Sequence, residues 1–241
     1  MAAEAPQGPR ARYREQTRAE IKEAALRQLA EGGAAALALT RIAKEMGLSG
    51  PALYRYFASR DDLLNALIRD AYDDAAAAVG AASADAAAGS PREQLHVLAR
   101  GYRAWAVAQP HRYLLIQGAP LPGYVAPADT LDRARAVLGP FLRVFAGATA
   151  GASAVPVVRQ MAAWAESDAT VGGWVAEYVE YPEGAEDADA GPVLAGAVLA
   201  WAQVHGAVGL EVAGQFAGMG HDGATLLAAQ MDTLADAFAL V

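Results

Sequence analysis

The side chains best suited to bind another molecule lie in one stretch of the chain, from Leu37 to Leu64. This stretch offers guanidinium groups at Arg41 and Arg55 and a phenol at Tyr54. Such groups donate hydrogen bonds to phosphate oxygens and to the edges of nucleic-acid bases. The stretch therefore predicts a nucleic-acid contact rather than a reaction centre.

Two short helices joined by a turn are needed to present these groups. Apolar residues recur at helical spacing from Leu39 to Met46, Gly47 interrupts them, and the pattern then resumes. Ser49 is suited to cap the second helix, and Pro51 stands in its first turn, where the missing amide hydrogen costs little. The arrangement predicts a helix-turn-helix whose second helix enters the major groove of DNA.

The outward face of this second helix is slim where it begins. Gly50 and Pro51 allow the backbone to approach the bases, while Tyr54 and Arg55 reach farther. Arg60 lies in the first turn of the following helix, where a cation interacts unfavourably with the helix dipole. Such a position makes sense if a phosphate is the partner of Arg60. With Arg41, these residues are expected to contact DNA.

The charge of the chain is unevenly distributed. The net charge is −8, but residues 1–70 carry +2 and residues 71–241 carry −10. A basic arm near the start of the chain contains arginines at 10, 12, 14 and 18, and we expect Arg12 and Arg14 to follow phosphates. A solvated charged tail is the alternative interpretation of this arm.

Composition sets the broad class. Alanine and leucine dominate the 241 residues and no strand-like alternation persists, which predicts an all-α fold. The absence of cysteine excludes disulfides and thiolate sites, and no signal peptide is recognisable, so a cytoplasmic protein is expected. Residues 190–210 are uncharged and long enough to span a bilayer, but Pro192, Gln203 and His205 favour a helix buried in a soluble protein.

The domain organisation follows from helical periodicity and from glycine and proline. We expect a disordered basic arm at 1–12, a DNA-binding domain at 13–60, and a ligand-binding and dimerisation domain at 61–241. The expected helices cover about 13–31, the two short helices, 60–79, 91–109, 111–117, 128–146 with a kink at Pro140, 155–167, 191–216 and 222–240. The segments 80–90, 118–127 and 172–189 are expected to be loops.

The second domain contains two further sets of candidate residues. Aromatic or soft side chains with a polar group are expected to line a ligand pocket: Tyr102, Trp105, Tyr113, Met161, Trp164 and His205. Ordinary core packing is the alternative for each. The last two helices are apolar on more than one face and predict a four-helix interface with a second copy, through Leu199, Ala202, Gly206, Leu210, Leu227, Met231 and Leu234.

Enzymatic chemistry has little support in the sequence. The four histidines, His96, His111, His205 and His221, show no spacing typical of a metal site, and there is no phosphate-binding loop or nucleophile elbow. We expect no metal, no cofactor and no catalytic residue. A helical enzyme that uses His205 or His221 as a base is the remaining alternative of that class.

Residues 13–70 resemble the DNA-binding domain of TetR/AcrR-type transcriptional regulators. The resemblance rests on the pair Ile42-Ala43, the turn Gly47-Leu48-Ser49 and the sequence Tyr54-Arg55-Tyr56-Phe57. It implies that Ser49, Tyr54 and Tyr56 contact the operator and that Arg60 holds a phosphate where the family usually has lysine. Ala38 departs from the family's usual Ser or Thr cap, and Thr40 is expected to offer a hydroxyl near the phosphates instead.

Farther along, Trp201, His205 and Gly206 resemble the Trp-His-Gly signature of one C-terminal subgroup of that family. The resemblance to TetR/AcrR-type regulators implies a homodimeric repressor that a small-molecule effector releases from a quasi-palindromic site on double-stranded DNA. A ligand-independent regulator or activator, whose second domain only dimerises, is the alternative.

Overall fold

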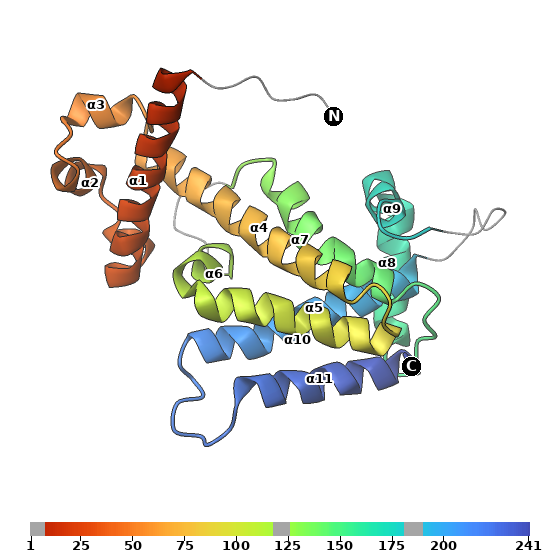
Figure 1. Cartoon of the computed structure of the whole chain (residues 1–241). Coiled ribbons are helices and arrows are strands. Elements are labelled where there is room, and N and C mark those ends of the chain that lie inside the picture. Colours follow the sequence, from red (N-terminus) through yellow and green to blue (C-terminus); the bar gives the residue numbers. More distant parts are fainter. Residues whose placement is uncertain (1–7, 118–125, 181–189) are drawn as a thin grey trace. The chain divides into compact units, whose positions relative to one another are not determined.

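The structure is a computed structural model that describes residues 8–117, 126–180 and 190–241. These residues form α-helices and one short 3-10 helix, and no strand (Figure 1). The α-helices are α1 (Pro9–Gly32), α2 (Leu39–Glu45), α3 (Gly50–Tyr54), α4 (Arg60–Asp85), α5 (Pro91–Ala108), α6 (Pro110–Gln117), α7 (Thr130–Val144), α8 (Val155–Ser167), α9 (Ala169–Ala176), α10 (Gly191–Val212) and α11 (Gly223–Ala237). The expected all-α class is confirmed.

The chain divides into two compact units, which we call the head and the body. The head comprises residues 1–71 and 111–127, and the body comprises 72–110 and 128–241. The unbroken helix α4 begins in the head and continues into the body, so the division falls inside α4 rather than at residue 60. The head also includes α6, which the sequence assigned to the second domain.

The head is organised around a small apolar core. Ile21 of α1, Ile42 of α2 and Leu53 of α3 are all fully buried, as are Phe57 and Leu63. Because α2 and α3 are too short to be stable alone, this shared core holds them in place beside α1.

The first helix begins earlier than the sequence suggested. The helix α1 starts at Pro9, so Arg10 and Arg12 are helical rather than part of a disordered arm. Proline in the first turn supports this start because its fixed φ suits a helix and its missing amide hydrogen has no intrahelical acceptor there. Residues 1–7 lie outside the described residues.

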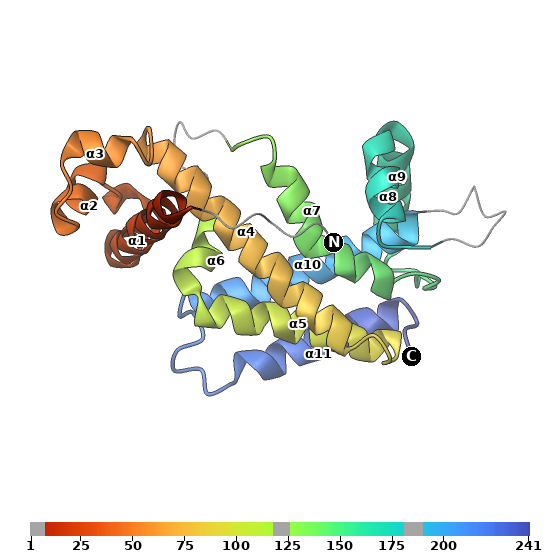
Figure 2. The ribbon, with the colours of Figure 1, turned by 45° about the horizontal axis from the view of Figure 1, so that its top comes forward.

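The body is built around α10. This helix packs against α5, α7, α8 and α11, and α5, α10 and α11 lie side by side (Figure 2). Its buried side chains include Val193, Leu194, Val204 and Val208. The helix is long and apolar enough to cross a membrane, but it is largely surrounded by other helices of the body, as expected for a core helix.

Two expected loops of the body contain helix. The helix α4 runs to Asp85, and α9 occupies 169–176, where a loop was expected from residue 172. Asp168 caps α9 by accepting a hydrogen bond from the amide of Thr170 at 2.9 Å, a signal that the glycines at 172 and 173 obscured in the sequence. The expected loop at 118–127 and the acidic end of 172–189 lie largely outside the described residues.

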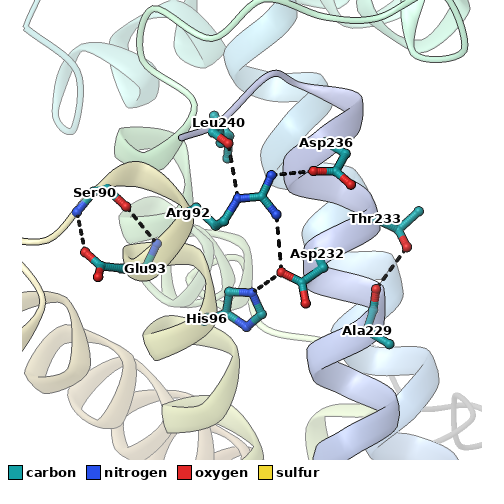
Figure 3. Close-up of polar contacts among 9 residues, drawn as sticks. All are labelled: Ser90, Arg92, Glu93, His96, Ala229, Asp232, Thr233, Asp236 and Leu240. Atoms are coloured by element: carbon teal, nitrogen blue, oxygen red, sulfur yellow. Dashed lines mark hydrogen bonds and ion pairs between the residues drawn. The ribbon is translucent and has the colours of Figure 1, made fainter.

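Polar contacts fasten the start of α5 to α11 and to the C-terminal residues (Figure 3). Ser90 and Glu93 form a capping box at the start of α5. Arg92 donates to the carbonyl oxygen of Leu240 at 3.2 Å and pairs with Asp232 and Asp236. His96 lies 2.9 Å from Asp232, and this hydrogen bond lowers the pKa of that carboxyl. These contacts tie together segments about 140 residues apart.

Candidate DNA-binding surface and the aromatic cluster of the body

The two short helices and the turn between them present an exposed surface. We call it the reading surface, and it consists of the exposed residues Thr40, Arg41, Lys44, Ser49, Gly50, Pro51, Tyr54 and Arg55. Tyr54 is 51 % exposed although its neighbours Leu53 and Phe57 are completely buried. The apolar residues thus face the head's core, and the hydrogen-bonding residues face outward.

The turn between α2 and α3 depends on a glycine and a serine. Gly47 has φ +65°, a left-handed conformation that side chains disfavour, and it lets the backbone reverse after α2. The Ser49 hydroxyl accepts a hydrogen bond from the amide of Ala52 at 3.3 Å and caps α3, as the sequence predicted. The resulting helix has only five residues, and it begins with Gly50 and Pro51.

The start of α2 lacks a side-chain cap and is held by a residue of another helix. Ala38 occupies the N-cap position and offers no side-chain hydrogen bond. Its own amide donates to the Gln28 side-chain oxygen at 2.9 Å, and Gln28 is only 1 % exposed on α1. The entry of α2 is therefore fixed by a contact that spans ten residues, and no local capping pattern could have predicted it.

The start of α4 borders the reading surface. The Ser59 hydroxyl accepts from the amide of Asp62 at 3.0 Å, and the Asp62 carboxylate accepts from the amide of Ala58 at 2.9 Å, so these two residues cap the start of α4. Arg60 donates from Nε to the carbonyl oxygen of Leu37 at 3.2 Å and lies 3.4 Å from Asp61. Its guanidinium is therefore anchored beside the start of α2 and remains 38 % exposed.

Positive charge predominates on this part of the head. Residues 38–60 contain four cationic side chains and one carboxylate, Glu45, which pairs with Arg27 at 2.5 Å. Arg41 pairs with Glu31 at 2.5 Å, but both side chains are more than half exposed. Exposed ion pairs contribute little free energy, so Arg41 can exchange Glu31 for a phosphate.

Lys44 is a candidate DNA contact that the sequence analysis missed. It is exposed one helical turn after Thr40, and no partner for its ammonium group is found in the described part of the chain. The spacing of four residues between Thr40 and Lys44 was the available signal, because such residues share one helix face.

The remaining predicted DNA contacts occupy different environments. Arg12 and Arg14 are exposed on α1, and Tyr56 is half-buried. Arg18, which belongs to the same basic segment as Arg12 and Arg14, instead points into the head and donates to the carbonyl oxygen of Tyr56 at 2.5 Å.

In the body, four rings from α5 and α10 form an aromatic cluster: Tyr102, Trp105, Trp201 and His205. The centroids of Trp201 and His205 are 4.0 Å apart in an edge-to-face arrangement, and those of Tyr102 and Trp201 are 5.1 Å apart. The Tyr102 hydroxyl and His205 Nε2 share a hydrogen bond at 3.3 Å. Trp201 was absent from the predicted pocket, although its spacing of four residues from His205 placed it on the same helix face.

The aromatic cluster is electrically neutral. Burial lowers the pKa of His205 to about 4, so its imidazole is uncharged at neutral pH. The nearest charges along the two helices are Arg103 and Glu211, which neutralise each other in a bidentate pair at 2.7 and 2.6 Å. Gly223 leaves room for this pair, because a Cβ there would lie 2.5 Å from the Glu211 carboxyl carbon.

The other three predicted pocket residues belong to other helices. Tyr113 belongs to the head, where it is fully buried, and this burial raises the pKa of its phenol to about 12. Met161 and Trp164 lie on α8, a helix without a single buried residue, and Trp164 is 37 % exposed. Of the predicted residues in the body, the structure brings together Tyr102, Trp105 and His205. Met161 and Trp164 lie on another helix, α8.

The predicted dimer residues divide into two groups. Leu199, Ala202, Gly206 and Leu210 form an incompletely covered stripe on α10, which we call the outer stripe, and Leu210 is 48 % exposed. The prediction is wrong for Leu227, Met231 and Leu234 of α11, because these side chains are at most 2 % exposed inside the body and cannot contact a second copy. Both helices are apolar, and only their neighbours in the fold distinguish core from surface.

Two family models match the chain. Residues 21–67 match the model described as bacterial regulatory proteins, tetR family. Residues 95–234 match the model described as a tetracyclin repressor-like C-terminal domain. The first match spans α2 and α3, and the second contains the whole aromatic cluster.

Individual relatives agree with these models. The chain is 38 % identical to the HTH-type transcriptional regulator Rv1816 of Mycobacterium tuberculosis, over 87 % of this chain and 86 % of the relative. It is similar, at 39 % identity and a TM-score of 0.70, to the crystal structure of the regulatory protein SCO4313, covering 94 % of this chain and 98 % of that one. The transcriptional regulator FadR from Bacillus subtilis in complex with stearoyl-CoA shares the fold, at 14 % identity and a TM-score of 0.51, over 90 % of this chain and 96 % of that chain.

Proposed function

This chain belongs to the TetR family of bacterial transcriptional regulators, and we propose that it is a homodimeric cytoplasmic repressor that a small-molecule effector releases from a quasi-palindromic operator. The observation that carries the proposal is the reading surface. A buried apolar core orients exposed cationic, hydroxyl and phenol groups toward one side of α2 and α3.

The reading surface divides its work between positioning and base recognition. Arg41, Lys44 and Arg60 are suited to phosphates, since each is a cation that is at least partly exposed at an end of a helix. Tyr54 and Arg55 lie near the C-terminal end of α3, and Gly50 and Pro51 lie at its slim beginning. Because few side chains can read bases, specificity also depends on the shape of the DNA and on the distance between two such helices.

The dimer would form through α8 and α10. The outer stripe of α10 and the uncovered side chains of α8 lie on two helices that pack against each other. The stripe combines small residues at 202 and 206, which let helices approach closely, with the exposed Leu210. A second copy related by a two-fold axis would cover both helices and complete a four-helix interface. This assignment replaces α11 with α8.

The effector site is proposed at the aromatic cluster. An uncharged or weakly polar ligand suits a site whose rings are apolar and whose imidazole is neutral. His205 and the Tyr102 hydroxyl are the groups that would fix its orientation through hydrogen bonds. Trp201, His205 and Gly206 also support membership of the subgroup with a Trp-His-Gly signature.

The continuous helix α4 would connect the two functions. Its first residues belong to the head and its later residues to the body. An effector that favours one position of α4 would change the spacing of the two reading surfaces in the dimer. Effector and operator must then oppose each other's binding by the same factor.

Selection of bound fragments from a random DNA pool, at a stated salt concentration, tests the DNA-binding part. We expect enrichment of a sequence with two-fold symmetry whose half-sites are separated by about one helical turn or a multiple of it. A pool that yields no enriched sequence would contradict sequence-specific DNA binding. An enriched sequence without symmetry would contradict the homodimer.

A thermal-shift screen with small apolar compounds tests the effector part. Compounds that raise the melting temperature should weaken operator binding, and both effects should diminish in His205→Phe. The variant His221→Phe is a matched control, because His221 is an exposed histidine that lies outside the aromatic cluster. Compounds that bind at the aromatic cluster without changing operator affinity would support a ligand-independent regulator instead.

A further inference from the structure

The C-terminal end of α3 carries carbonyl groups that the helix itself cannot satisfy. A helix of five residues has more unpaired carbonyls at its end than hydrogen bonds in its interior. Arg18 of α1 supplies a donor just beyond this end: its Nη1 lies 2.5 Å from the carbonyl oxygen of Tyr56, two residues after the last residue of α3. A cation at this end of a helix is also favoured by the helix dipole.

A second contact fixes the same guanidinium. The Arg18 guanidinium carbon lies 4.3 Å from the centre of the Phe57 ring. Phe57 is completely buried, as is Leu53 one turn before it, so the ring provides a rigid platform. An arginine held between a carbonyl oxygen and an aromatic face has little freedom to turn outward.

The position of Arg18 differs from that of the arginines around it. Arg14, one helical turn earlier on α1, is exposed and has no partner for its side chain in the described part of the chain. Arg18 is half-buried, and one of its donors is bonded to the turn that follows α3. The sequence placed both in one basic segment, because residue type alone does not distinguish a phosphate contact from a contact inside the head.

We propose that Arg18 is a positioning residue for DNA recognition: it fixes the angle at which α3 presents Tyr54 and Arg55 and does not itself contact a phosphate. This role rests on the proposed function. Its consequence is selective, because a tilted α3 loses contacts with base edges, whereas the phosphate contacts of Arg14 and Lys44 are retained.

Salt dependence separates the two kinds of arginine. Operator affinity is measured from 50 to 300 mM salt for the full-length wild type, Arg18→Met, Arg18→Lys and Arg14→Met, with a scrambled DNA of equal length as the non-specific reference. Removing one phosphate contact from each subunit lowers the slope of log affinity against log salt by about 1.8 for a dimer.

We expect Arg18→Met to lose at least about tenfold in operator affinity while its salt slope and its affinity for scrambled DNA stay at the wild-type values. Arg14→Met should weaken binding to both DNAs and lower the slope. Arg18→Lys should recover part of the operator affinity, because its ammonium group can donate to Tyr56 but does not stack as a guanidinium does.

Two outcomes would overturn the role of Arg18. One is an operator affinity of Arg18→Met equal to that of the wild type. The other is a salt slope reduced by about 1.8 together with equal losses of affinity for the operator and for scrambled DNA. If Arg18→Met loses its helical circular dichroism, the same two outcomes are scored on Arg18→Lys. A wild-type chain that binds no selected DNA would instead overturn the proposed function itself.

Discussion

The head and the body place their candidate functional side chains in opposite environments. In the head, a packed core turns polar groups outward, and Tyr54 is 51 % exposed beside the completely buried Leu53. In the body, Tyr102 is completely buried and the pKa of His205 falls to about 4. A surface that reads a large ligand needs exposed groups on a firm support, whereas a site for a small ligand needs polar groups that are already shielded from water.

The largest effect is expected at Met231 of α11, which the sequence predicted as a dimer contact and which is buried in the body. Met231→Ala should lower the free energy of unfolding by about 3 kcal/mol, because the substitution leaves a cavity at a fully buried position. Denaturant unfolding at fixed protein concentration measures this loss. Leu210→Glu is the matched variant: it should dissociate the dimer in analytical ultracentrifugation while the monomer stays folded. A Met231→Ala protein of normal stability that no longer dimerises would restore α11 to the interface.

The next effect concerns the head alone. Tyr54→Ala should weaken operator binding about 100-fold, or nearly 3 kcal/mol, because it removes an exposed contact of the reading surface from both subunits. Fluorescence anisotropy with the selected operator measures the change. Dimerisation and melting temperature should be unaltered, since the side chain packs little against the head. Wild-type affinity in this variant would mean that α3 is not the reading helix.

A pH titration distinguishes the buried site from the exposed one. The pKa of His205 is lower in the folded protein than its ordinary 6.5, so the unfolded chain binds a proton first as the pH falls. Stability from the neutral imidazole is therefore complete above about pH 6.5 and is lost progressively as the pH falls toward 4. Between pH 7.5 and 5 the free energy of unfolding, measured with denaturant, should fall by about 2 kcal/mol more in the wild type than in His205→Gln. Equal losses in both proteins would contradict a desolvated imidazole.

The smallest effect belongs to an exposed cation of the head. Lys44→Gln should weaken operator binding only a few-fold and reduce the salt slope by about 1.8 for the dimer, because one phosphate contact is lost per subunit. Melting temperature should not change, since no partner of the Lys44 side chain is found in the described residues. A slope equal to that of the wild type would remove Lys44 from the phosphate contacts.

Local signals predicted most of the head. The glycine turn and the Ser49 cap involve residues only a few positions apart, and both are present in the structure. The prediction failed where a partner was distant: the Gln28 side chain accepts from the amide of Ala38 at the start of α2, and Arg18 binds Tyr56 rather than continuing the basic arm.

In the body, periodicity predicted helices better than it predicted their surroundings. The boundaries of α5 and α8 are close to the predicted ones. The helix α5 begins at Pro91 and α8 ends at Ser167, as the sequence indicated. The pocket and dimer predictions mixed inward and outward residues. Trp164 and Trp105 are the same residue type on amphipathic helices, yet only Trp105 joins the aromatic cluster.

The sequence by itself determined the helical class, the helix-turn-helix and the membership of a regulator family. Each depends on residue types at short, regular spacings, which the backbone geometry of a helix translates directly into a shared face. Tertiary structure alone decided that α8 has no fully buried side chain while Leu227, Met231 and Leu234 of α11 are core, that His205 meets Tyr102, and that Arg18 bonds to Tyr56. These outcomes depend on which distant helix covers which face, and an apolar or cationic side chain has the same identity whether it is covered or not.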